Sequence, residues 1–222
     1  MITRAVGLIC LLTLLASGAH AYMFNWDVNA PHVQFFADAN DAVGPGGKDI
    51  LQGIWWGWDS TNDIYYFRMD LEAPPSLSDA GDIYGIYIDG GPGGSLAANP
   101  YVPSELTGID YIVDSHWNQI DDFFPPHYHQ YTGVGAGWDT NVGYTPIFAN
   151  NENGGATLEW RIPGAALPDE FRFWGGVIDT GGGVVTTWDL AEGGVTPEPT
   201  TLALLGLGLG GLYLRRRRAA EL

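Results

Sequence analysis

Three tryptophans, Trp55, Trp56 and Trp58, stand close together in an apolar stretch of the chain. Flat indole rings stack well on the pyranose rings of sugars. In an extended strand Trp56 and Trp58 would share one face, and Trp55 would point to the other. An exposed Trp56–Trp58 pair would therefore form a carbohydrate-binding platform. The alternative, which the size of the indole favours, is that both residues fill the core of the domain.

Residues whose side chains carry oxygen atoms come directly after these tryptophans in the sequence. Asp59, Asn62 and Asp63 are expected to form a turn, and further carboxylates fall at or near the ends of expected strands: Asp89, Asp110 and Asp114. Hard oxygen ligands in loops suit calcium, but Ile64 stands where an EF-hand loop requires glycine. Asp59 and Asn62 could instead cap the turn without a metal. We therefore expect no cofactor, with calcium at Asp59, Asn62, Asp63 and Asp89 as the alternative.

His127 and His129 would project to one side of an extended segment, and His116 could join them only through folding. Two histidines are too few for a zinc site, so we expect exposed loop histidines. Glu105 and Glu159 could be drawn as the acid and base of a glycosidase, but an acidic chain offers many such pairs.

Several classes of function are disfavoured. The chain has no nucleophile elbow, Walker loop or dinucleotide fingerprint, and its Gly90–Gly94 run lacks the lysine and helix of a phosphate site. We therefore do not expect an enzyme. The stretch from Tyr22 to Pro199 contains four basic residues and 25 acidic ones. This charge would repel nucleic acid, and an acidic polysaccharide would need a bridging divalent metal.

Seven short segments rich in β-branched or aromatic residues are expected as strands: Leu51 to Trp58, Ile64 to Leu71, Ile83 to Asp89, Ile109 to Trp117, Ala156 to Ile162, Phe171 to Asp179 and Val184 to Asp189. The one helical turn expected is Pro163 to Leu167. Residues 99–108 and 121–137 are expected as longer loops. The pattern predicts an all-β domain over 22–195, an antiparallel β-sandwich, with Tyr84, Ile86 and Ile88 on its core face.

The first 21 residues have the features of a signal peptide: Arg4, an apolar run, and Ala19-His20-Ala21 as a cleavage site. We expect an N-terminal signal helix and cleavage after Ala21. Cys10, the one cysteine, lies in the removed segment, so the mature chain would have no thiol and no disulfide.

The far end places Pro197, Glu198 and Pro199 before an apolar segment, 201–214, and then Arg215, Arg216, Arg217 and Arg218. Thirteen helical residues from Leu202 reach only about 20 Å into a hydrocarbon core of roughly 30 Å, which makes a short transmembrane helix. The arginines would remain in the cytoplasm and the upstream domain outside. The alternative, a core helix with a basic tail, fits poorly because the apolar residues surround the helix.

These three parts, over Thr196 to Ala220, resemble the PEP-CTERM sorting signal of Gram-negative bacteria. The resemblance implies recognition and cleavage by an exosortase close to the Pro-Glu-Pro motif. It also implies a transient membrane anchor through the C-terminal helix, and delivery to the cell surface or to the exopolysaccharide of a biofilm or floc matrix.

The middle of the chain resembles the DOMON-like sandwiches that include family 9 carbohydrate-binding modules. Four stretches carry the resemblance: 59–67, 87–91, 108–111 and 158–163. It implies a jelly-roll-like sandwich that is frequently ligand-binding and sometimes stabilised by calcium. Our leading hypothesis is an exported, non-enzymatic surface or matrix protein. The alternative is a carbohydrate-binding module that binds polysaccharide, with calcium as a candidate cofactor.

Overall fold

The computed structural model describes residues 23–30, 32–39, 41, 49–51, 53–75, 82–95, 102–116, 126–133, 138–140, 143–144, 146–152, 156–179 and 186–195. The expected signal peptide, including Ala19 and Ala21, and the expected sorting tail from residue 196 onwards lie outside these ranges. Within the described residues there is no helix with the length and apolar character needed to cross a membrane.

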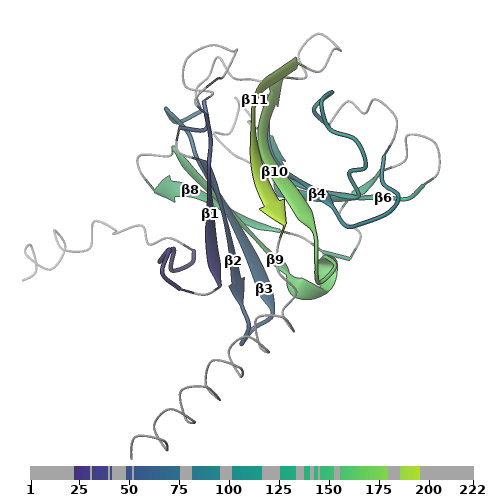
Figure 1. Ribbon diagram of the computed structural model, residues 1–222, viewed down its shortest axis with the longest axis horizontal. Coiled ribbons are helices and arrows are strands. Elements are labelled where there is room, and N and C mark those ends of the chain that lie inside the picture. The colour runs from purple at the N-terminus through teal and green to yellow at the C-terminus, as the bar shows by residue number, and fades with distance from the viewer. Residues whose placement is uncertain are drawn as a thin grey trace, which may run out of the picture.

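Two antiparallel sheets form the domain (Figure 1). The five-stranded sheet, sheet A, has the order β1 (Val33–Ala37), β2 (Gly53–Asp59), β3 (Ile64–Asp70), β9 (Thr157–Pro163) and β8 (Ile147–Glu152). The six-stranded sheet, sheet B, has the order β11 (Thr186–Val195), β10 (Arg172–Asp179), β4 (Asp82–Asp89), β5 (Tyr111–His116), β6 (Pro126–Tyr131) and β7 (Trp138–Thr140). The all-β antiparallel sandwich predicted from the sequence is confirmed.

The core lies between the sheets and is rich in aromatic rings. Trp56, Phe67 and Met69 of sheet A are buried against Tyr84 and Phe173 of sheet B, together with other members of one cluster. The Phe67 and Phe173 rings meet edge to face, with centroids 5.6 Å apart. Each fully buried side chain of this size contributes about 1.5–3 kcal/mol. Apolar burial between the two inner faces therefore holds the sandwich together.

Strand β4 is buried on both faces. Tyr84, Ile86 and Ile88 face the main core, as predicted. Tyr87 faces outward, but it is covered by a second small cluster that contains Val102 and Ile109 from the segment 102–109. The alternation along β4 predicts its core face, but it does not predict that the segment 102–109 covers the outer face as well.

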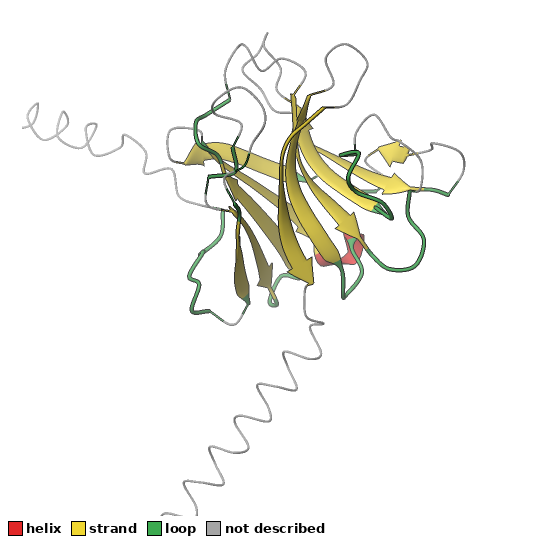
Figure 2. Ribbon diagram, turned by 45° about the horizontal axis from the view of Figure 1, so that its top comes forward, coloured by secondary structure: helices red, strands yellow, loops and turns green. Residues whose placement is uncertain are grey.

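The seven expected strands are present as β2, β3, β4, β5, β9, β10 and β11, and the helical turn is the 3-10 helix η3 (Gly164–Ala166) shown in red in Figure 2. Four further strands were not predicted: β1, β6, β7 and β8. The expected loop 121–137 is wrong over 126–131, where β6 pairs with β5. Strand β6 is not predicted because its sequence is polar, with two histidines on its outer face.

Candidate metal centre

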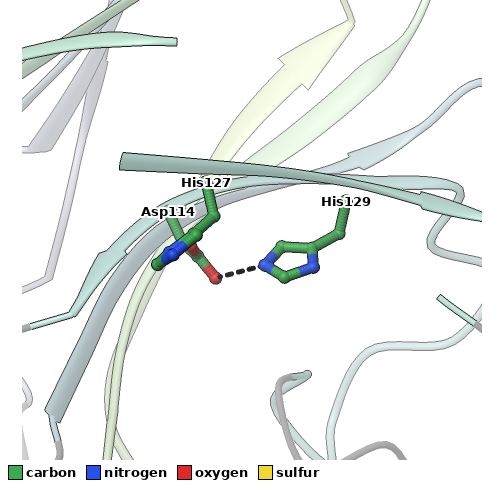
Figure 3. Close-up of side chains that lie close together, drawn as sticks. All are labelled: Asp114, His127 and His129. Atoms are coloured by element: carbon green, nitrogen blue, oxygen red, sulfur yellow. Dashed lines mark ion pairs between the residues drawn. The ribbon is translucent and has the colours of Figure 1, made fainter. Parts of the chain in front are cut away.

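Asp114, His127 and His129 come together on the outer face of sheet B (Figure 3). Asp114 of β5 pairs directly with His127 of β6 in the antiparallel register. Residues two apart in a strand point to the same side, so His129 joins them. His127 Nδ1 lies 3.4 Å from Asp114 Oδ1, and His129 Nε2 lies 3.4 Å from Asp114 Oδ2.

The three side chains differ in their access to water. The Asp114 side chain is fully buried, the His129 side chain is 8% exposed, and the His127 side chain is 27% exposed. A buried carboxylate is costly unless hydrogen bonds or a neighbouring positive charge compensate it. The cluster is therefore a polar site inside the domain that opens to the surface at His127.

Gly85 of β4 leaves space beside this cluster. It pairs with Asp114, and a Cβ at Gly85 would lie 3.2 Å from Asp114 Cβ and 3.4 Å from Tyr87 Oη. The Tyr87 hydroxyl thus lies beside Asp114. Tyr87 Oη is buried and has no hydrogen-bond partner in the described part of the chain. Burial, and then the charge of Asp114, raise the pKa of Tyr87 well above its usual value, so the hydroxyl stays protonated.

Two imidazoles and one carboxylate form a ligand set for a transition metal. Open three-ligand sites of this type hold zinc, and the combination of two histidines with one carboxylate also occurs with non-haem iron. Calcium prefers an all-oxygen set, so it fits this cluster poorly. Of the carboxylates that the sequence offered as calcium ligands, Asp114 belongs to this cluster, and the described residues place none of the others in a close group of His, Asp or Glu side chains.

A second cluster consists of Asp38, Asp49 and Asp189, where the end of β1 and the residues before β2 approach β11. Asp189 accepts hydrogen bonds from the backbone N–H groups of Ile50 at 2.6 Å and Leu190 at 2.7 Å. Burial, followed by the charge of Asp38, raises the pKa of Asp189 to about 7 despite these bonds. As a ligand set, this cluster offers only carboxylate oxygens.

The structure distinguishes the two interpretations of the tryptophan pair. Trp56 is 1% exposed and belongs to the main core, and Trp58 is half-buried and packs against the same core. The core position that the size of the indole favours is therefore the one that Trp56 occupies, and its ring is not available as a sugar platform. Trp55 lies on the opposite face of β2, where its indole N–H donates to Asp70 and the Arg68 guanidinium lies 4.9 Å above its ring.

The four residues of the alternative calcium site do not all come together, although Asp59 and Asn62 are in contact. Asp59 accepts hydrogen bonds from the backbone N–H groups of Thr61 and Asn62 and from the Asn62 amide, so it caps the β2–β3 turn. The Asn62 side chain, followed by these backbone bonds, lowers the pKa of Asp59. Asp89 belongs to β4 of the other sheet and accepts from Gly91 N–H. Asp59, Asp63 and Asp89 form no close carboxylate cluster among the described residues.

The two carboxylates that could be drawn as a glycosidase pair have different surroundings. Glu159 of β9 is buried and accepts hydrogen bonds from Met23 N–H and the Trp26 indole, which fasten residues 23–26 onto the outer face of sheet A. Glu105 is exposed and accepts from the Thr187 hydroxyl on sheet B. This arrangement does not pair them across a substrate site.

The histidine prediction requires correction. His127 and His129 lie in a strand and not in an exposed loop, and His129 is buried. The third ligand, Asp114, lies 13 residues earlier and meets them only through the β5–β6 register. The sequence signal for this site is that His127 and His129 are two residues apart and so share one face of a strand. The aspartate, Asp114, lies on the same face of the preceding strand.

Residues 195–218 match the family of the PEP-CTERM protein-sorting motif. This match confirms the resemblance that the tail carries, including Pro197, Glu198, Pro199 and the arginines 215–218. Neither the curated proteins nor the solved structures give a match to the chain. The motif identifies an exported protein that an exosortase processes at the membrane, and it describes the tail alone.

Proposed function

We propose that this exported protein is a non-enzymatic component of the cell surface or extracellular matrix of a Gram-negative bacterium, associated with exopolysaccharide or biofilm. The sorting motif at residues 195–218 carries the proposal. Segment 201–214 holds the precursor in the membrane until the exosortase removes the tail.

The boundary between sandwich and tail supports release of the intact domain. Strand β11 ends at Val195, two residues before Pro197. A cut close to the Pro-Glu-Pro motif therefore leaves both sheets whole. The released domain carries a large excess of negative charge, which keeps it soluble and makes direct binding to an acidic polysaccharide unfavourable. A neutral glycan, or an acidic one bridged by divalent ions, suits this surface better.

The side chains that suggested other activities support a non-enzymatic role. Glu159 belongs to β9 of sheet A, whereas Glu105 lies in a turn and accepts a hydrogen bond from Thr187 of sheet B. The alternative of a carbohydrate-binding module built on Trp56 and Trp58 loses its main anchor, because Trp56 is buried.

The test follows the full chain in a bacterium that has an exosortase. A Pro197→Ala, Glu198→Ala, Pro199→Ala triple variant is compared with wild type by cell fractionation and intact-mass measurement. We expect wild type without its arginine cluster in the surface or matrix fraction, and the variant with that cluster in the membrane fraction. The matched control changes Asp169 and Glu170, two exposed residues after a proline in the sandwich, to alanine and should behave as wild type. Identical processing of wild type and the triple variant would contradict the proposal.

A further inference from the structure

We propose that Asp114, His127 and His129 bind a zinc ion on the outer face of sheet B. The inference goes beyond sorting and does not depend on it. It starts from the geometry of three side chains that lie on neighbouring strands and whose ligand atoms all lie within 4.8 Å of one another.

The distances within the cluster fit a shared metal ion. Tetrahedral zinc with bonds of about 2.0–2.1 Å keeps neighbouring ligand atoms about 3.4 Å apart. Each histidine nitrogen lies 3.4 Å from a different oxygen of the Asp114 carboxylate, His127 Nδ1 from Oδ1 and His129 Nε2 from Oδ2. A direct charge-assisted hydrogen bond between these groups would be shorter, at about 2.7–2.9 Å. The cluster therefore has the spacing of ligands around an ion.

Tyr87 provides an independent indication of a ligand. Its fully buried hydroxyl lies beside Asp114 and has no hydrogen-bond partner among the described residues. A buried hydroxyl without a partner costs about 1–3 kcal/mol. Zinc with three protein ligands keeps its fourth position for water. That water accepts a hydrogen bond from Tyr87, which completes the site.

The surroundings favour zinc among the metals that such ligands bind. Imidazole nitrogens favour a transition metal over calcium or magnesium. The protein is exported, and compartments outside the cytoplasm are oxidising, whereas zinc has no redox chemistry. The partly exposed His127 side chain gives the ion a path from solvent. Bound there, zinc would link β5 to β6.

Two titrations test the site. Mature wild type, recovered from the exporting host and freed of metal by a chelator, is titrated with ZnCl₂ by calorimetry and with CoCl₂ by visible spectroscopy. We expect one equivalent of zinc to bind, a rise in melting temperature, and for cobalt the intense visible bands of a tetrahedral site. A folded wild type with neither zinc heat nor a shift in melting temperature would overturn the proposal.

The variants assign the ligands. His127→Ala changes the most exposed ligand and should keep the fold while weakening zinc binding by more than roughly 100-fold. Tyr87→Phe keeps the ring and should weaken it by about 10-fold, as removal of an outer partner does. His32→Ala, a histidine on the sheet A side of the molecule, is the matched control and should bind zinc as wild type does. Zinc binding by His127→Ala at wild-type strength would place the ion elsewhere and overturn the assignment.

Discussion

Asp114, Asp189 and Glu159 are carboxylates that lie away from water, and each has different neighbours. Asp114 lies between two histidines, Asp189 accepts two backbone hydrogen bonds, and Glu159 accepts from a backbone N–H and an indole. Among these groups, Asp189 also faces the charge of Asp38. At the scale of single residues, the neighbours of each buried carboxylate therefore decide how its negative charge is compensated.

Asp189 should make the fold less stable as the pH rises. Its pKa is about 7 in the folded chain, against 3.8 for an ordinary aspartate, so the folded state binds more protons between these values. As the pH rises from about 4 to about 7, wild type should therefore lose stability relative to Asp189→Asn. Chemical unfolding of both proteins in chelator at several pH values measures the difference.

The Asp59→Asn variant is the control for this prediction because its expected sign is opposite. The pKa of Asp59 is lowered by its turn hydrogen bonds, so its contribution to stability is present above pH 4 and is lost as the pH falls. A flat difference between wild type and Asp189→Asn over pH 4–7 would show that Asp189 has an ordinary pKa.

At the scale of elements, glycine allows β10 to pack closely against sheet A. A Cβ on Gly175 would lie 2.5 Å from Ile54 Cγ2 and 3.2 Å from Met69 Cε. These atoms belong to β2 and β3 in the facing sheet. The two sheets can approach to this distance only because Gly175 has no side chain.

Gly175→Ala should therefore destabilise the domain by about 1–3 kcal/mol through overpacking. Ile54→Ala should also destabilise it, through a cavity. The double variant should lose less stability than the sum of the two single variants, because removal of Ile54 Cγ2 makes room for the new methyl group. Denaturant unfolding of all four proteins measures the coupling, and strictly additive losses would show that the two positions do not compete for space.

Local composition predicts the strands that have a strongly apolar or aromatic face, such as β2 and β4, and it identifies the turn that Asp59 caps. It misses β6, because His127, His129 and Gln130 give no apolar alternation. It also misses the Asp114 cluster, since a long stretch of chain separates Asp114 from His127 and only the strand register joins them. The burial of Tyr87 is also missed. Alternation would place this side chain in solvent, but the segment 102–109 covers it.

The charge of the whole molecule is concentrated in the sandwich, where 25 acidic residues face four basic ones between Tyr22 and Pro199. Such an excess repels itself in the compact state. The described ion pairs that involve arginine, Arg68 with Asp70 and Arg172 with Glu192, offset little of it.

Salt should therefore stabilise the folded domain. Raising NaCl from about 10 mM to about 150 mM shortens the Debye length from roughly 30 Å to about 8 Å and screens the repulsion. We expect the melting temperature of the mature protein, measured in chelator, to rise over this range. An unchanged or lower melting temperature would show that the acidic groups are already compensated in the fold.

The position of β11 has a mechanical consequence. It is an edge strand of sheet B, whose ladder partner among the described strands is β10, and its last residue directly precedes the tail. Its ladder with β10 is interrupted at two irregularities, between Phe173 and Trp174 and between Val177 and Ile178. A pulling force on the anchored precursor therefore reaches β11 first and acts on short runs of hydrogen bonds one after another, so this strand would detach before the strands at the centre of either sheet.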